Sequence, residues 1–187
     1  SNSMIKNTIS YFWLLVAGLC LIASCQSVAP PNSPTVKISR VMSGQAVEWV
    51  DRSQTPPIIQ QGRLLRIDDP DLAQEPWGKQ AKQRLEELID ISGKDSVTLE
   101  FESTDADKFG RKFVYLWKDG RLLNEQLLRD GYVLASMRTP SSSSSNTNGA
   151  KYRDRFSRGS QYARLMGQGI WNPQLPMRMS PSEFRKE

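Results

Sequence analysis

The chain contains no histidine, and its two cysteines, Cys20 and Cys25, both lie in an apolar stretch near the N-terminus. The absence of histidine excludes Ser-His-Asp and Cys-His triads, histidine-ligated zinc sites and a histidine general base. With no cysteine after Cys25, no disulfide can staple the rest of the chain. Any hydrolytic chemistry must therefore use carboxylates, arginines, lysines, water or a hard cation.

The composition sets the size and charge of the protein. A chain of 187 residues with 38% hydrophobic and 24% charged residues suits one globular domain with short tails. The net charge of +5 is compatible with a polyanion partner such as nucleic acid, or with an anionic membrane surface. Because many ordinary proteins carry a similar surplus, charge alone does not decide between these partners.

The N-terminal segment has the pattern of an export signal. Lys6 precedes an apolar stretch over residues 11–23, which is shorter than the about 20 residues a membrane span needs. The stretch ends in Leu-Ile-Ala-Ser-Cys25, which resembles the lipobox of bacterial lipoproteins. The alternative is a plain signal peptide, or an anchor helix with an incidental cysteine.

We expect residues 1–25 to be a lipoprotein signal peptide that ends at a lipidated Cys25. Residues 26–34, rich in Pro, Ser and Asn, then form a flexible linker. Several acyl chains give stable anchoring where one chain is marginal. The sequence thus predicts a membrane-anchored lipoprotein on the extracytoplasmic side.

Apolar periodicity predicts an α+β fold. Alternating residues predict strands over 35–50 (with a turn at Ser43-Gly44), 63–68, 97–101 and 113–117, with a Pro/Gln-rich loop over 54–61. Helical spacing predicts helices from Pro76 to a stop at Ser92-Gly93, from Leu123 to a cap at Gly131, and from Tyr152 to Gly167.

Five strands with a helix after the third fit a five-stranded OB-fold barrel with three helices, here over residues 35–172. The serine-rich segment 141–149 is predicted to be a flexible loop, and residues 173–187 a Pro-rich, partly ordered tail.

Two segments place carboxylates close to an arginine at a strand end: residues 63–71 and residues 105–111. Arginine forks bind phosphate, clustered carboxylates bind hard cations such as calcium, and a carboxylate can deprotonate water. Together these groups suit phosphodiester hydrolysis. The alternative is a pair of solvated loops with surface ion pairs, and spacing alone favours that alternative.

Three stretches and a short closing motif carry a resemblance to a known family. They are Arg63-Leu-Leu-Arg-Ile-Asp-Asp-Pro-Asp71, Asp107-Lys-Phe-Gly-Arg-Lys-Phe-Val-Tyr115, Asp119-Gly-Arg-Leu-Leu-Asn-Glu-Gln-Leu-Leu-Arg-Asp-Gly131 and Gly169-Ile-Trp171. In this order they resemble the staphylococcal nuclease (thermonuclease) family from about residue 36 to residue 171. The resemblance implies the OB barrel with three helices, hydrolysis of DNA or RNA, and calcium as cofactor.

The resemblance also assigns roles to individual residues. Arg63 and Arg111 match the two catalytic arginines, and Asp68 matches a calcium-ligand aspartate. Asp69 stands where a backbone carbonyl ligates the metal. Asp71 replaces the glutamate proposed as general base, with a side chain one methylene shorter.

Lys108 and Phe109 match a lysine and a tyrosine near the nucleotide phosphate, and are therefore predicted to bind substrate. The first turn departs from the family pattern, because Ser43-Gly44-Gln45 replaces a turn with two aspartates. Gln45 still offers a neutral amide oxygen to the metal, and Asp69 adds a carboxylate if its side chain points inward. We therefore expect a weakened calcium site.

Three hypotheses follow from the sequence. The first is a lipid-anchored phosphodiesterase that cuts nucleic acid outside the cytoplasm. The second is a non-catalytic OB module that binds nucleic acid or a protein at the membrane. The third is a structural subunit of a membrane complex, with residues 173–187 as the arm that docks a protein partner.

Overall fold

The structure is a computed structural model of the chain, and it describes residues 29–30, 32–94, 96–136 and 152–187. The predicted signal segment with Cys25 and the serine-rich segment 141–149 lie outside these residues. Among the residues that are described, no helix is long and apolar enough to cross a membrane.

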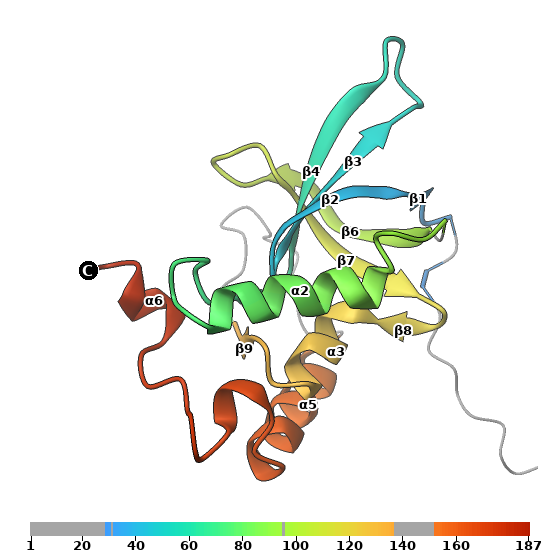
Figure 1. The fold of residues 1–187 in the computed structure, drawn as a ribbon. Coiled ribbons are helices and arrows are strands. Elements are labelled where there is room, and N and C mark those ends of the chain that lie inside the picture. Colours follow the sequence, from blue (N-terminus) through green and yellow to red (C-terminus); the bar gives the residue numbers. More distant parts are fainter. Residues whose placement is uncertain (1–28, 31, 95, 137–151) are drawn as a thin grey trace, which may run out of the picture.

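A curled sheet forms the centre of the domain (Figure 1). Its strand order is β1-β6-β7-β4-β3-β2, and β8 pairs with β7. Neighbouring strands are antiparallel, except that β4 and β7 run parallel. The strands are β1 (Thr35–Val36), β2 (Ile38–Ser43), β3 (Ala46–Asp51), β4 (Ile58–Leu64), β6 (Val97–Ala106), β7 (Lys112–Lys118) and β8 (Arg121–Leu122).

The N-terminal strand links the two edges of this sheet. β1 pairs with β6 and β2 pairs with β3, although only Lys37 separates β1 from β2. One extended stretch of chain therefore touches both ends of the strand order, and the sheet curls as in an OB barrel. Five strands have six or more residues in the described part. The predicted α+β fold of the OB type is confirmed.

The core fills the inside of the curled sheet. Trp49 is 3% exposed, and it lies over Gly62 on the neighbouring strand β4. A Cβ atom at Gly62 would be 3.0 Å from the Trp49 ring and 3.1 Å from Val114, so glycine leaves room for the indole. Burying a large aromatic side chain of this kind contributes several kcal/mol at about 25 cal/mol per Å².

Among the described residues, the three longer helices are α2 (Trp77–Ile89), α3 (Leu123–Arg129) and α5 (Arg153–Leu165). Helices α2 and α3 pack on the sheet, and α5 packs on α3 (Figure 1). Helix α2 packs against β2, and its buried residues recur at helical spacing: Gly78, Ala81, Leu85 and Ile89. A Cβ atom at Gly44 would lie 2.7 Å from the Cβ of Ala81. The β2–β3 turn is therefore pressed directly onto α2.

A buried asparagine fixes the chain that follows β4. Asn124 on α3 is fully buried. Its Oδ1 accepts from the Leu116 N–H at 3.0 Å, and its Nδ2 donates to the Leu65 carbonyl at 3.0 Å. Buried amides are retained where every polar atom has a partner. Asn124 thus holds the segment after β4 in a fixed position relative to β7 and α3.

Two strand boundaries differ from the sequence prediction. Residues 54–61 were predicted as a loop, but β4 begins at Ile58 because the backbone there pairs with β3, opposite Asp51. The strand predicted over 63–68 breaks after Leu64, where Arg66 adopts a left-handed conformation (φ 64°). The chain then pairs elsewhere, as β5 (Ile67–Asp68) against β9 (Leu134–Ala135).

The end of α2 and the C-terminal tail also differ. Helix α2 stops at Ile89 rather than at Ser92-Gly93, because Asp90 is left-handed (φ 55°) and its N–H closes the last turn. The tail predicted as partly ordered contains α6 (Pro181–Phe184), which follows the short helix η1 (Gly169–Trp171). A capping box between Ser180 and Glu183 starts α6.

Candidate active site

A cleft of about 480 Å³ lies between the β2–β3 turn, the segment after β4 and the loop before β7. Its lining includes seven of the residues predicted from the sequence: Gln45, Arg63, Asp69, Asp71, Lys108, Phe109 and Arg111. Asp68 contacts Arg185, which also lines the cleft. The fold therefore gathers predicted residues from three separate segments at one place.

Arg63 points a guanidinium group into this cleft from β4. No described residue forms a hydrogen bond or an ion pair with its side chain. Burial lowers the pKa of Arg63, and the positive charge of Arg111 lowers it further, against the opposing effect of nearby carboxylates. A half-buried guanidinium that has no partner in the described part of the chain is suited to binding phosphate.

Asp107 and Arg111 lie at the two ends of a tight loop, and the Asp107 carboxylate holds the Arg111 side chain. The Arg111 Nε donates to Asp107 Oδ2 at 2.7 Å and its Nη2 lies 2.6 Å from the same oxygen. The other oxygen, Oδ1, accepts from the N–H groups of Phe109 (2.9 Å) and Arg111 (3.0 Å). Desolvation raises the pKa of Asp107, but these hydrogen bonds outweigh it and the pKa lies below its usual value. Asp107 therefore orients both the loop and the arginine.

Phe109 and Lys108 form the rim of the cleft. Phe109 is 68% exposed, and its ring lies 5.0 Å from Lys108 Nζ and 5.3 Å from Arg111 Cζ. An exposed aromatic ring between two cations combines a stacking surface for a base with charge for a phosphate. The role of both residues in binding substrate stays a prediction.

Asp71 supplies a carboxylate to the same cleft. Its Oδ1 accepts from the Ala73 N–H at 2.9 Å, and its carbonyl accepts from Gln74 N–H at 2.8 Å, so a turn ahead of α2 fixes it. Its Oδ2 accepts no hydrogen bond from the described residues. That oxygen is free to take a proton from water.

The carboxyl group of Asp69 lies inside the protein rather than in the open part of the cleft. The carboxyl group is buried, with the residue 5% exposed, and its Oδ2 has no donor among the described residues. Burial raises the pKa of Asp69 to about 6, although the Ser43 hydroxyl and the Gln45 N–H oppose this shift. The extra carboxylate thus lies against the β2–β3 turn.

Arg185 reaches the two oxygens that the resemblance assigns to calcium. Its Nη2 donates to Asp68 Oδ1 at 2.6 Å, and its Nη1 donates to the Asp69 carbonyl at 3.3 Å. Figure 1 shows α6, which precedes Arg185, beside the segment that leads into α2. The C-terminal end of the chain is therefore part of the cleft.

These residues do not fit a calcium ion as they stand. Calcium takes six to eight oxygen ligands, yet Arg185 already donates to Asp68 and to the Asp69 carbonyl. The β2–β3 turn offers no carboxylate, although the buried Oε1 of Gln45 has no donor in the described part of the chain. Across residues 29–30, 32–94, 96–136 and 152–187, no group of three or more His, Cys, Asp or Glu side chains is arranged to hold a metal.

Sequence reasoning placed Asp107 in the carboxylate-rich segment 105–111 but gave it no role of its own, and it missed Arg185. Asp107 had a signal, because an aspartate three residues before a glycine marks a turn that its side chain caps; Gly110 indeed has a positive φ of 80°. Arg185 had none, since the residue that it contacts, Asp68, is 117 positions away.

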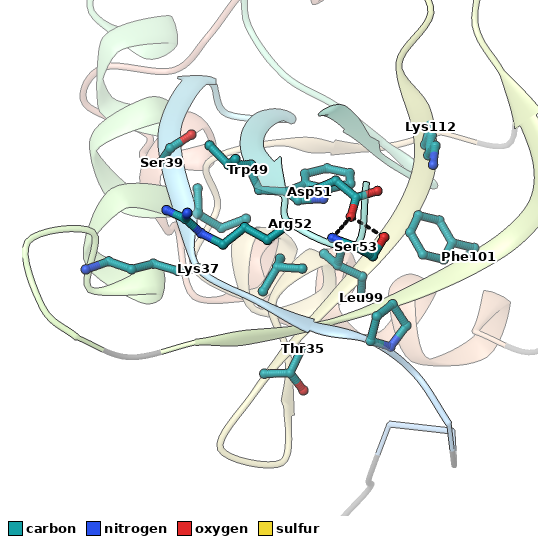
Figure 2. Close-up of a pocket in the computed structure, with 14 residues that line it drawn as sticks. Thr35, Lys37, Ser39, Trp49, Asp51, Arg52, Ser53, Leu99, Phe101 and Lys112 are labelled. Carbon is teal, nitrogen blue, oxygen red and sulfur yellow. Dashed lines mark hydrogen bonds between the residues drawn. The ribbon is translucent and has the colours of Figure 1, made fainter. Parts of the chain in front are cut away.

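A second hollow, of about 690 Å³, lies beside the N-terminal strand (Figure 2). Asp51 is the carboxylate in its lining, and it accepts hydrogen bonds from the Ser53 N–H (3.0 Å) and hydroxyl (2.6 Å). Lys37, Arg52 and Lys112 are the cations of this lining. Because this hollow lacks the paired arginines and free carboxylate of the first cleft, we place the chemistry in the first.

Comparison with known proteins defines the class. A family model described as "Staphylococcal nuclease homologue" matches residues 61–173, which is more than half of the chain. The protein belongs to the staphylococcal nuclease family. The resemblance that the sequence motifs carried is thereby confirmed.

Individual relatives are nucleases. The chain is 25% identical over 146 residues to the Thermonuclease of Staphylococcus hyicus, covering 75% of this chain and 78% of that protein. It is 31% identical over 144 residues to the SPbeta prophage-derived endonuclease YokF of Bacillus subtilis, covering 73% and 44% of the two chains. For Endonuclease YncB of the same species the identity is 30% over 144 residues, covering 73% and 61%. The chain thus spans less than two thirds of the two Bacillus proteins.

Proposed function

We propose that the protein is a lipid-anchored phosphodiesterase that hydrolyses DNA or RNA outside the cytoplasm, with a weakened calcium site. The observation that carries the proposal is the convergence of Arg63, Arg111 and Asp71 on one cleft. The nuclease names of the relatives support nucleic acid as the substrate.

The arginines bind the scissile phosphate in this proposal. Arg63 has no partner among the described residues, so its whole fork is available to phosphate oxygens. Asp107 holds Nε and Nη2 of Arg111, which orients that side chain and leaves its Nη1 to donate to a phosphate oxygen. Their positive charges stabilise the negative charge that grows on these oxygens in the transition state. The stacking surface of Phe109 and the charge of Lys108 hold the neighbouring nucleotide.

Asp71 acts as the general base. A water oxygen attacks phosphorus, its proton passes to Asp71 Oδ2, and the P–O bond to the leaving oxygen breaks. Asp71 is a methylene shorter than the glutamate of the family pattern, and a displacement of about 1 Å can cost on the order of a hundredfold in rate. We therefore propose a slow enzyme.

The test is cleavage of single-stranded DNA by the purified chain, in calcium and in EDTA. The matched control is the double variant Arg63→Ala/Arg111→Ala, prepared and assayed in the same way. We expect cleavage by the wild type and a loss of at least about a hundredfold in the variant. Cleavage no faster than the variant in either condition would overturn the proposal.

A non-catalytic nucleic-acid-binding module is the second candidate. It is favoured by the β2–β3 turn, where Ser43 and Gln45 stand in place of two aspartates. On this alternative the wild type cuts no DNA, and the double variant Ser43→Asp/Gln45→Asp gains activity. Wild-type activity equal to that of the restored variant would contradict this alternative.

The membrane anchor is a separate part of the proposal, supported by the lipobox pattern that ends at Cys25. The variant Cys25→Ala should move the protein from the membrane fraction to the soluble fraction. Cys20→Ala is the matched control and should leave the protein at the membrane. Equal membrane association of the two variants would contradict lipidation at Cys25.

A further inference from the structure

The geometry points to Arg185 as the group that occupies the position a divalent ion would need in this cleft. Arg185 and a divalent ion therefore exclude each other at this position. This inference rests on the proposed function only in treating this cleft as the active site. The direct observation is the pair of hydrogen bonds to Asp68 Oδ1 at 2.6 Å and to the Asp69 carbonyl at 3.3 Å.

The tail is built to bring Arg185 to this position. Pro181 is buried at the first turn of α6, which a capping box stabilises. Just ahead of α6, the Met179 carbonyl accepts a hydrogen bond from Gln74 Nε2 at 2.8 Å, and the Gln74 residue is only 6% exposed. Further back, the Met177 N–H donates to the Ile170 carbonyl at 2.9 Å. Several independent contacts thus hold the segment against the domain, so Arg185 does not depend on its ion pair alone.

Arg185 occupies the oxygens that face it directly. Asp68 is the carboxylate that contacts Arg185, whereas the carboxyl group of Asp69 is buried against the neutral turn of Ser43 and Gln45. The guanidinium therefore takes both Asp68 Oδ1 and the Asp69 carbonyl. A divalent ion at the same two oxygens would have to share them with Arg185, in a cleft that Arg63 and Arg111 also line.

Two consequences follow for the ligands of the cleft. A divalent cation must displace Arg185 from Asp68 and from the Asp69 carbonyl before it can bind. A phosphodiester, in contrast, meets three guanidinium groups that line the same cleft, those of Arg63, Arg111 and Arg185. Binding of a nucleic-acid backbone should therefore need no metal.

The experiment measures calcium binding to the full chain in detergent by isothermal titration calorimetry. The variants are Arg185→Ala and Arg185→Gln, which keeps a polar N–H donor but removes the charge. Arg178→Ala is the matched control, because it removes the same charge from an exposed residue of the same tail. All are also prepared with Gln45→Asp, whose added carboxylate brings the calcium affinity into the measurable range.

We expect both Arg185 variants to bind calcium about tenfold more tightly than their parent, and the control to remain within about twofold of it. A tenfold change is equivalent to about 1.4 kcal/mol, a size that fits a partly exposed, charge-assisted contact. If Arg185→Ala unfolds, Arg185→Gln still gives the comparison.

Equal calcium affinity with and without Arg185 in the Gln45→Asp background would overturn the inference. An equal gain in the Arg178→Ala control would also overturn it, because the effect would then be one of general charge. Calorimetry measures calcium affinity whether or not the protein cleaves DNA. A failure to cleave DNA would therefore contradict the proposed function, while the calcium affinities would still test the role of Arg185.

Discussion

Replacing the buried Asp69 by asparagine should stabilise the protein at neutral pH but not in acid. Burial raises the pKa of Asp69 from 3.8 to about 6, and its Oδ2 has no donor among the described residues. Asparagine has nearly the same shape and carries no charge to bury. Its amide oxygen can accept from the Gln45 N–H, as the carboxylate does.

The size of the effect follows from the pKa. Each pH unit between 3.8 and about 6 is equivalent to about 1.4 kcal/mol, so ionising Asp69 in the folded protein costs about 3 kcal/mol. Below about pH 4 the group is protonated in both the folded and unfolded states, and no cost arises. The cost grows as the pH rises from about 4 to about 6, and is complete above that.

The assay is urea unfolding of the wild type and Asp69→Asn at pH 4.0, 5.0, 6.0 and 7.5, monitored by tryptophan fluorescence. The stability of the variant relative to the wild type should rise by about 2–3 kcal/mol between the first pH and the last. Asp71→Asn, a partly exposed neighbour that keeps its Oδ1 acceptor, is assayed alongside as the control for removing a carboxylate from the same cleft. A constant difference for Asp69→Asn over this range would refute the argument from burial.

Three further substitutions test two features of the fold and one of the site. Asn124→Ala should lower the free energy of unfolding by about 2–4 kcal/mol, because it leaves a buried carbonyl and a buried N–H unpaired; urea unfolding measures this, and a loss below about 1 kcal/mol would contradict it. Gly131→Ala should cost at least about 2 kcal/mol more than Gly110→Ala: both glycines have positive φ, but a Cβ would lie 2.2 Å from the Gln168 carbonyl oxygen at the first and meets nothing within 4 Å at the second. Asp107→Asn should reduce cleavage about tenfold by releasing the Arg111 side chain, with little change in melting temperature; an unchanged rate would show that Asp107 does not position the arginine.

The parts of the fold that sequence predicts best are those that local patterns control. The alternating residues around Val97 and Phe113 and the Asp119-Gly120 turn correspond to β6, β7 and the turn after β7, in which both residues have positive φ. In β6, Val97 and Leu99 are buried while Thr98 between them is partly exposed, and that alternation is visible in a short window. The five residues of β7 from Phe113 to Trp117 are all buried, and a short continuous apolar run of this kind also indicates a strand.

The parts that it misses depend on distant partners. Ile58, Ile59 and the polar residues that follow them form β4 because their backbone pairs with that of β3, a contact that no local sequence pattern records. Arg66 turns the chain with a φ of 64°, a conformation that arginine rarely adopts, so composition gives no warning of it. The contact between Arg185 and Asp68 likewise depends on a distant partner, since it joins the C-terminal tail to strand β5, 117 residues earlier in the chain.

The motif resemblance explains why the site was anticipated better than its surroundings. Arg63, Arg111 and Asp71 were predicted together, and they line one cleft. The motifs did not contain the tail, so they could not indicate that Arg185 contacts the predicted metal ligands. The roles of the individual residues stay predictions until variants are assayed.

The rate at which the full chain and its Arg63→Lys variant cleave a labelled single-stranded oligonucleotide tests the central claim most directly. Lysine keeps the positive charge but loses the fork that binds two phosphate oxygens. We predict measurable cleavage by the wild type and a rate lower by about a hundredfold in the variant, with similar melting temperatures. Equal rates, or no cleavage by the wild type with calcium or with EDTA, would contradict a nuclease site built around Arg63.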